Sequence, residues 1–154
     1  MRERPYRVTF VSSLFSADGL DREDSNTTLG LLLEALTKVN EILMWRQRLP
    51  SLYQSGVRYQ AEPIGTEDWL DALQVLLRRY ADCEDLAAYR AAELRVYHRI
   101  RARPVYIFGT DGQGRQLYHC RVRYPASAGP QHPSATLIGD EYEEDPSVVL
   151  GMRQ

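Results

Sequence analysis

Apolar positions recur with a helical period in the first third of the chain. A short strand-like run at 6–11 and a polar loop at 16–26 come first, and a stop follows at Pro50. Between the loop and the stop, apolar side chains return every three or four residues, at Leu29, Leu32, Leu33, Leu36, Val39 and Leu43. This period predicts one long helix, and the hydroxyl of Thr27 or Thr28 is suited to cap its first turn.

Two more helices are predicted in the middle of the chain. Residues 65–68 are typical of a helix start, with a threonine cap followed by two acids. The apolar positions that follow predict its buried face, at Trp69, Leu70, Leu73, Leu76, Leu77 and Tyr80. The next helix is expected at about 83–96, and its small residues Ala87 and Ala91 lie in line with Cys83. Small side chains at that spacing would let this helix pack closely on a sheet.

The period then changes to that of strands. An apolar strand is predicted at 104–108, turn residues occupy 109–114, and an alternating strand returns at 116–124. Alternation divides the returning strand into two faces. One face carries Leu117, His119, Arg121 and Arg123, and the other carries Tyr118, Cys120, Val122 and Tyr124. After a loop rich in Pro, Ala, Ser and Gly, a last short strand near 135–138 precedes an acidic run at 140–145.

Helices followed by an antiparallel meander predict an α+β fold. A chain of 154 residues without an internal repeat or a long linker predicts a single domain at 1–154. We expect an N-terminal strand and the long helix in 1–50, and the core that carries the chemistry in 51–154. A hydrophobic content of 44% and a charged content of 26% are ordinary for a soluble globular protein.

The charge balance argues against an anionic partner. The formal net charge is -2, so no global field favours nucleic acid or an acidic membrane surface. Almost all basic residues are arginines, and one group surrounds His98 without an aromatic platform, at Arg95, Arg99, Arg101 and Arg103. We interpret this group as a solvated surface and expect neither nucleic acid nor a membrane as a partner.

Cysteine and histidine usage predicts a reduced protein without a bound metal. Two cysteines are too few for a disulfide framework in a chain of this length. The three histidines and two cysteines show no paired metal-ligand spacing, so we expect no cofactor and no metal. The apolar run at 8–15 is too short and too polar for a signal peptide or a membrane span, which favours a cytoplasmic protein.

Three residues are candidates for catalysis. Cys83 is expected at the first turn of a helix, His119 within a strand, and Asp145 directly before Pro146. Cysteine, histidine and aspartate in this order, each at the edge of a regular element, are typical of a thiol-nucleophile triad. A helix N-terminus and an imidazole favour the thiolate, and a carboxylate fixes the tautomer of the imidazole. Pro146 should hold Asp145 in an extended conformation.

Each candidate also has a structural interpretation. A single cysteine is more often a small buried hydrophobe, and an isolated strand histidine is more often bonded to backbone. Spacing alone leaves alternatives open, which are His98 and His132 for the histidine and Asp140 and Glu144 for the acid.

The surroundings of Cys83 both lower and raise the expected pKa of its thiol. Asp82, Glu84 and Asp85 place negative charge beside it and should raise its pKa. Cys83 therefore needs an imidazolium partner to react at neutral pH. Its backbone N–H should face the oxyanion that forms when its sulfur attacks a carbonyl.

Three stretches of the chain resemble a known family. The run Ala81-Asp82-Cys83-Glu84-Asp85-Leu86-Ala87 is similar to the motif G-D-C-E-D-L-A around the nucleophile of the transglutaminase-like superfamily. Residues 118–122 resemble its histidine strand, and 144–147 with 150–152 resemble its terminal acid segment. The resemblance covers about 49–152 and points especially to small transglutaminase-like cysteine peptidases of bacteria and phages.

The resemblance implies a papain-like fold, in which a helix bearing Cys83 packs on a small antiparallel sheet bearing His119 and Asp145. Cys83 would be the nucleophile, His119 the general base and acid, and Asp145 the orienting carboxylate. The reaction would be acyl transfer on an amide of a protein or peptide substrate through a thioester. We expect hydrolysis, because so small a site has no evident means of excluding water. The alternatives are a transglutaminase and a non-catalytic phage assembly or binding protein.

The chain departs from the family pattern in two places. Ala81 stands where glycine is usual, which would strain a turn that required a positive φ. The loop at 125–133 is longer than the tight hairpin expected there, and it leaves the register of Asp145 open. Tyr59 and Gln60 are candidates for a second oxyanion donor from their positions alone. The sequence predicts nothing about the oligomeric state.

Overall fold

The structure is a computed structural model that describes residues 5–63, 68–110, 112–113 and 116–152. Its helices and strands are α1 (Arg22–Arg46), η1 (Leu52–Gln54), β1 (Arg58–Tyr59), α2 (Ala72–Arg78), β2 (Tyr80–Ala81), α3 (Cys83–His98), β3 (Arg103–Thr110), β4 (Gln116–Pro125), η2 (Ala126–Ala128), β5 (Thr136–Ile138), β6 (Glu141–Glu144) and α4 (Pro146–Val149). Helices precede an antiparallel sheet, so the predicted α+β class is confirmed.

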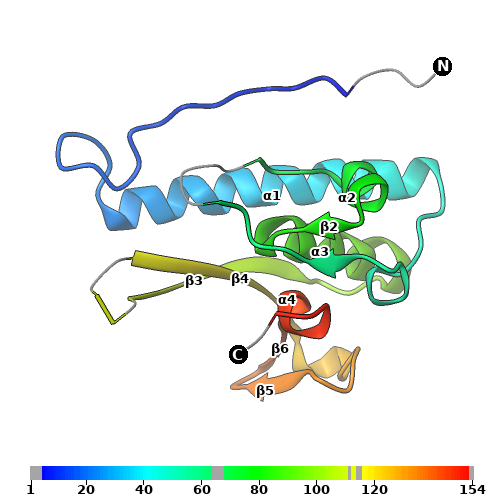
Figure 1. Ribbon diagram of the computed structural model, residues 1–154. Helices are drawn as coiled ribbons and strands as arrows, with labels where there is room; N and C mark the ends of the chain where they lie inside the picture. The colour runs from blue at the N-terminus through cyan, green and yellow to red at the C-terminus, as the bar shows by residue number, and fades with distance from the viewer. Residues whose placement is uncertain (1–4, 64–67, 111, 114–115, 153–154) are drawn as a thin grey trace.

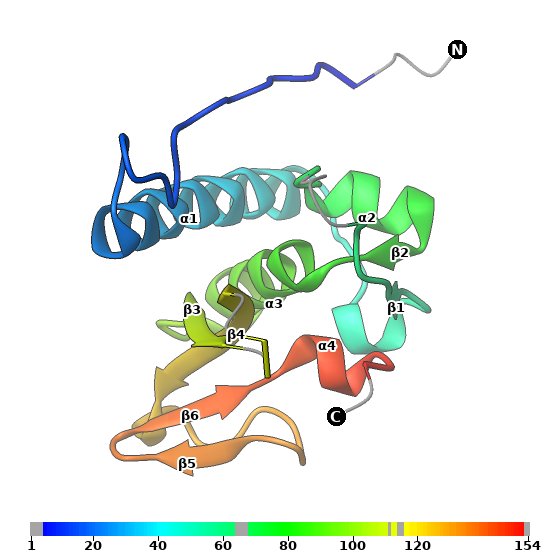
Figure 2. The ribbon, with the colours of Figure 1, turned by 60° about the vertical axis from the view of Figure 1, so that its left-hand side comes forward.

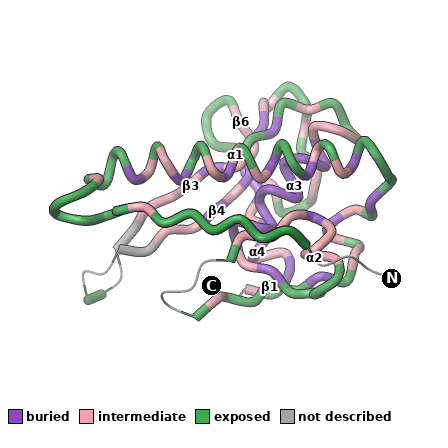
Figure 3. The backbone as a smooth tube through the Cα atoms, turned by 90° about the horizontal axis from the view of Figure 1, so that it is seen from above, coloured by how far each residue is buried: buried purple, intermediate pink, exposed green. Residues whose placement is uncertain are grey.

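The elements form layers around α3. The main sheet has the strand order β3-β4-β6-β5 with antiparallel neighbours, and β1 and β2 form a separate parallel pair. Helix α3 lies between α1 and the sheet (Figures 1 and 2). Every residue at 83–94 is buried, so α3 is the central helix of the core (Figure 3). Among the described residues, no helix is both long and apolar enough to cross a bilayer.

Helix α3 confirms the predicted helix at 83–96 and extends it by two residues. Asp82 caps it, and its first turn is closed by a capping box with Asp85. The helix ends at Arg99, which adopts the left-handed conformation. Three fully buried alanines on α3 lie in one apolar cluster with three buried side chains of β4, which are Cys120, Val122 and Tyr124. The predicted close packing of this helix on a sheet is therefore confirmed.

Helix α1 begins earlier than the sequence predicted. Its N-cap is Asp21, whose carboxylate accepts a hydrogen bond from the N–H of Asp24 at 2.8 Å. The hydroxyls of Thr27 and Thr28 bond back to carbonyls of the preceding turn, so neither residue caps the helix. The predicted apolar face is correct in part, because the buried residues include polar ones and are Ser25, Leu29, Leu33, Thr37, Asn40 and Met44. Each polar member forms a hydrogen bond inside the protein, although Nδ2 of Asn40 has no partner among the described residues.

The predicted strand at 6–11 is wrong. Within the described residues this stretch belongs to no sheet, and Tyr6 and Phe10 are 94% and 63% exposed. Alternating apolar residues form a strand only when a neighbouring strand takes up their backbone hydrogen bonds. This segment runs along the outside of α1 and meets no strand there (Figure 1).

Helix α2 also differs from its prediction. Most of the expected start at 65–68 lies outside the described residues, and α2 begins at Ala72 with Asp71 as its cap. Leu77 and Tyr80 were expected to be buried, but they are 55% and 53% exposed. Arg79 takes the left-handed conformation with φ 67°, ends the helix and turns the chain into β2, so Tyr80 lies outside the helix.

The C-terminal strands set the register that the sequence left open. Strands β3, β4 and β5 confirm the predictions at 104–108, 116–124 and 135–138 within two residues at each end, although most of the turn between β3 and β4 and the side chain of Leu117 lie outside the described part. The acidic run is a strand, β6, and Val122 of β4 lies opposite Glu144. Asp145 therefore leaves the sheet directly beside β4.

Candidate active site

Cys83 is the first residue of α3 and is 5% exposed. Asp82 caps the helix with a carboxylate that accepts a hydrogen bond from the backbone N–H of Cys83 at 2.7 Å. The expected role of this N–H as an oxyanion donor is therefore not available while Asp82 holds it. The helix start still directs its remaining N–H groups and its partial positive charge toward the thiol.

His119 and Asp145 are in direct contact. His119 projects from β4, and its Nε2 lies 2.8 Å from Oδ2 of Asp145. Asp145 has the extended backbone that Pro146 predicts, with φ -114° and ψ 92°, and its Oδ1 also accepts a hydrogen bond from Val148 N–H as the cap of α4. The two side chains keep 21% and 19% exposure, so the pair is partly open to solvent.

Cys83 completes the group. Two consecutive residues of β4 lie beside its thiol, and of these Cys120 raises the pKa of Cys83 and His119 lowers it. Because Nε2 of His119 is bonded to Asp145, Nδ1 is the ring nitrogen left for the sulfur. Three separate elements, α3, β4 and the end of β6, thus bring together the three residues that the sequence singled out.

The charges of the pair His119–Asp145 support each other. The hydrogen bond to Asp145, followed by the one to Cys83, raises the pKa of His119 to about 9, although burial acts in the opposite direction. Burial acts to raise the pKa of Asp145, but the hydrogen bond and charge of His119 outweigh it and hold this pKa below its usual range. At neutral pH the pair is an imidazolium and a carboxylate.

The resting thiol of Cys83 is protonated. The hydrogen bond with Cys120 and burial raise the pKa of Cys83, the hydrogen bond with His119 lowers it, and the charge of Asp82 raises it again. The direction of the Asp82 effect agrees with the sequence prediction. The thiol becomes a nucleophile only when the imidazole accepts its proton or stabilises the thiolate.

The alternative candidates lie elsewhere. His98 is exposed at the far end of α3, roughly 22 Å from Cys83 by the rise of an α-helix. His132 bonds to the hydroxyl of Ser134 at 2.6 Å and packs on the ring of Tyr53. Asp140 is exposed in the turn between β5 and β6. Glu144 faces away from the sulfur and is bound by Arg90.

The two residues suggested as second oxyanion donors use their backbone N–H groups elsewhere. Tyr59 N–H donates to the carbonyl of Leu150 at 3.0 Å, and Gln60 N–H donates to the carbonyl of Ala81 at 2.9 Å. Ala81 lies in the short strand β2 and is not among the residues with positive φ. Alanine in place of the usual glycine therefore causes no strain here.

Two residues lie near the site that were not identified as candidates from the sequence. Arg121 Nε lies 3.3 Å from Oδ2 of Asp145, so this carboxylate has a second cation beside His119. Its signal was present, because Arg121 was predicted on the same strand face as His119. Tyr106 of β3 lies opposite Cys120, and burial raises the pKa of its hydroxyl, which has no hydrogen-bond partner among the described residues. No sequence pattern marked Tyr106, because strand pairing alone brings it there.

A buried charge network lies behind Asp145. Glu144 is fully buried and accepts hydrogen bonds from Arg90 Nε at 2.9 Å, Tyr53 OH at 2.7 Å and Tyr124 OH at 2.6 Å. Arg90 also pairs with the buried carboxylate of Glu93, which accepts the N–H of Leu52. The network fixes the end of β6 against α3 and so fixes the starting point of Asp145.

One group of metal-ligand atoms occurs among the described residues. The ligand atoms of Asp82, Cys83 and Glu84 lie within 4.8 Å of one another. Acids at a helix start also serve as caps and favour the helix dipole, and Asp82 is used in this way. These three residues are where the described part of the chain could hold a cation.

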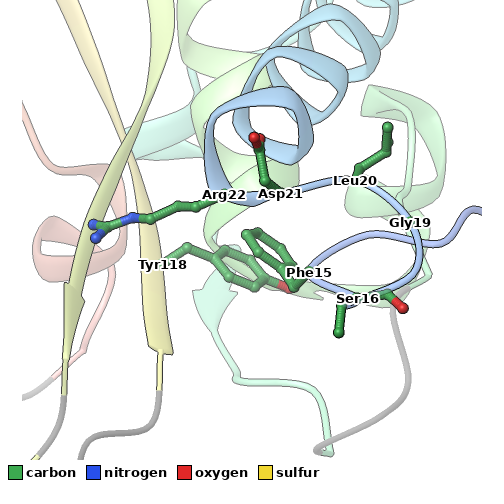
Figure 4. Close-up of a pocket in the computed structure, with 8 residues that line it drawn as sticks. Phe15, Ser16, Gly19, Leu20, Asp21, Arg22 and Tyr118 are labelled. Atoms are coloured by element: carbon green, nitrogen blue, oxygen red, sulfur yellow. The ribbon is translucent and has the colours of Figure 1, made fainter.

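Two cavities lie away from Cys83. One, of about 590 Å³, is formed by the loop at 15–22 and by Tyr118 of β4 (Figure 4). The other, of about 530 Å³, is lined by the middle of α1, the C-terminal end of α3 and the start of β3, and it includes the arginine group. In that group Arg95 pairs with Glu34 and Glu41. Neither lining contains a member of the cysteine, histidine and aspartate group.

No protein-family model, curated protein or solved structure matches this chain. The functional argument therefore rests on the residues and their geometry.

Proposed function

We propose that the protein is a thiol-dependent enzyme that transfers an acyl group from an amide through a thioester, with hydrolysis as the outcome. The observation that carries this proposal is the hydrogen bond of 2.8 Å between His119 Nε2 and Asp145 Oδ2, with the Cys83 thiol beside the same imidazole. Thiol, imidazole and carboxylate linked in this order are what nucleophilic catalysis by cysteine requires. The nucleophile helix packed on an antiparallel sheet supports a papain-like core of the transglutaminase-like kind.

Each residue has a defined step. His119 takes the thiol proton when it is in its neutral imidazole form, and the Cys83 thiolate attacks the amide carbonyl of a peptide or protein substrate. The His119 imidazolium then protonates the leaving amine, which leaves a thioester on Cys83. His119 next activates water, which hydrolyses the thioester. Asp145 holds the ring and stabilises the imidazolium throughout.

Formation of an oxyanion hole requires a change at the helix start. The N–H of Cys83 can donate to an oxyanion only after the carboxylate of Asp82 leaves it. The raised pKa of Cys83 and its 5% exposure agree with a closed resting state that a bound substrate would open.

The test is selective modification of the thiols. Brief alkylation at neutral pH, followed by peptide mass mapping, should label Cys83 before the fully buried Cys120. His119→Ala should slow the labelling of Cys83, because the imidazole that sustains the thiolate is gone. His98→Ala is the matched control, since this exposed histidine is far from the sulfur, and it should leave the rate unchanged.

Two results would contradict the proposal. Faster labelling of Cys120 than of Cys83 would remove the nucleophile, and an unchanged rate–pH profile in His119→Ala would remove the pairing. A peptide-amide library screened with and without added primary amine then separates hydrolysis from transamidation. A labelled Cys83 with no turnover on any amide would favour a non-catalytic protein that keeps the fold.

A further inference from the structure

The second cysteine lies beside the candidate nucleophile. Both cysteines are free, and Cys120 is the first cause of the raised pKa of Cys83, so the two side chains are neighbours. They belong to one buried cluster in which Ala87, Ala88 and Ala91 keep α3 close to β4. A disulfide requires two cysteines whose Cβ atoms approach closely, and small side chains between a helix and a strand favour such an approach.

The two thiols differ in their access to solvent. Cys83 retains 5% exposure, and Cys120 has none. An oxidant that enters from solvent therefore meets Cys83 first, while Cys120 can react only with a group inside the protein. His119 lies beside Cys83 and can exchange a proton with that sulfur, whereas Cys120 points to the opposite face of β4. Redox-active cysteines commonly combine an accessible thiol with a nearby second thiol.

We propose that Cys83 and Cys120 form a reversible oxidation site for hydroperoxides, which switches the nucleophile off by joining it to its neighbour. The disulfide itself does not depend on the proposed function, but its regulatory meaning rests on that function. This use of the two cysteines differs from a structural disulfide, because the reduced pair is the state seen in the fold.

The steps balance with hydrogen peroxide as the oxidant. The Cys83 thiolate attacks one peroxide oxygen, the O–O bond breaks, and the departing hydroxide takes the proton of His119 and becomes water. Cys83 is then a sulfenic acid. The Cys120 sulfur then attacks the Cys83 sulfur and the S–O bond breaks. The departing hydroxide takes the proton of the Cys120 thiol and leaves as the second water. The cysteines lose two electrons, and the peroxide becomes two waters.

The test follows the thiols by mass and needs no substrate. The wild-type chain and Cys120→Ala are treated with hydrogen peroxide, alkylated under denaturing conditions and mapped without reduction. The wild-type chain should lose two hydrogen masses, resist alkylation and yield a peptide that links Cys83 to Cys120. Dithiothreitol should restore both thiols. Cys120→Ala should instead gain oxygen atoms at Cys83 and fail to recover once the sulfinic acid has formed.

Three results would overturn the proposal. They are oxygen addition at Cys83 in the wild-type chain without the linked peptide, a linked peptide only between two molecules, and full recovery of Cys120→Ala with dithiothreitol. Circular dichroism checks the fold of the variant, and Cys120→Ser replaces it if the alanine variant unfolds. A linked peptide in a chain without acyl-transfer activity would refute the proposed function and leave the oxidation site standing.

Discussion

Two neighbouring carboxylates, Glu144 and Asp145, have opposite surroundings. Glu144 ends β6 and is fully buried, with Arg90 and two tyrosine hydroxyls on its oxygens. Asp145 follows it, keeps 19% side-chain exposure and is bonded to His119. Successive residues of a strand point to opposite faces, so one step along the chain separates a buried structural acid from a candidate catalytic one.

The partners of these two acids explain the difference between them. Burial acts to raise the pKa of Glu144, but the hydrogen bond and charge of Arg90 outweigh it and lower this pKa. His119 has the same effect on Asp145. A guanidinium stays protonated at all ordinary pH values, whereas an imidazolium can give up its proton. Only the Asp145 pair can therefore take part in proton transfer.

The largest expected effect is on turnover. Asp145→Asn should lower the rate on an acyl substrate by about 10⁴-fold, because the ring of His119 loses its orienting charge. The isosteric amide should keep the fold, although the protein loses the stabilisation that the His119–Asp145 charge pair provides. Asp140→Asn is the control, because Asp140 is exposed in a turn, and it should be nearly silent. The reverse pattern in steady-state kinetics would transfer the acid role to Asp140.

The next effect is on stability and concerns the other carboxylate. Arg90→Met should lower the free energy of unfolding by about 3–5 kcal/mol, because Glu93 and Glu144 would remain buried without their cation. Urea denaturation measures this change. Arg103→Met is the matched control, since its pair with Glu141 is half exposed, and it should cost less than about 1 kcal/mol. Equal and small losses in the two variants would show that the buried network does not hold β6.

The pH dependence of stability should reveal the Asp145 pair. The folded pKa of His119, about 9, lies above its ordinary value of 6.5. The stabilisation is therefore fully present below pH 6.5 and is lost as the pH rises through 9. Urea midpoints measured across this range should fall in the wild-type protein and fall less in His119→Gln. Parallel curves for the two proteins would exclude the strong His119–Asp145 pair.

The smallest expected effect comes from the second cation at Asp145. Arg121→Gln should change the rate of Cys83 alkylation by less than about tenfold, because a partly exposed ion pair contributes little when His119 remains. The measurement is the alkylation rate as a function of pH. A loss as large as that in His119→Ala would make Arg121 an equal partner in holding Asp145.

The local part of the fold could be predicted from the sequence. Helix α3 and strand β4 follow from capping residues, helical spacing and strict alternation, and these signals act over a few residues. The prediction of a strand at 6–11 was wrong because the residues alternate but no neighbouring strand is there to pair with them. The predicted start of α1 was too late, because Asp21 caps the helix in place of the later threonine hydroxyls. The polar residues after Asp21 show no helical repeat of apolar side chains that would have marked the first turns.

The candidate residues were identifiable from the sequence, whereas their contacts were not. Cys83, His119 and Asp145 were recognisable from residue type, element position and motif resemblance. The choice of Asp145 over Asp140 depended on the β4–β6 register, which hydrogen bonds between distant strands decide. Tertiary packing also buries Glu144 against Arg90 and places Cys120 beside Cys83. The hydrogen bond from the Cys83 N–H to the Asp82 carboxylate was likewise not predicted. Local sequence determines which elements form, but contacts between remote residues exist only once the core has packed, so only the tertiary structure decides them.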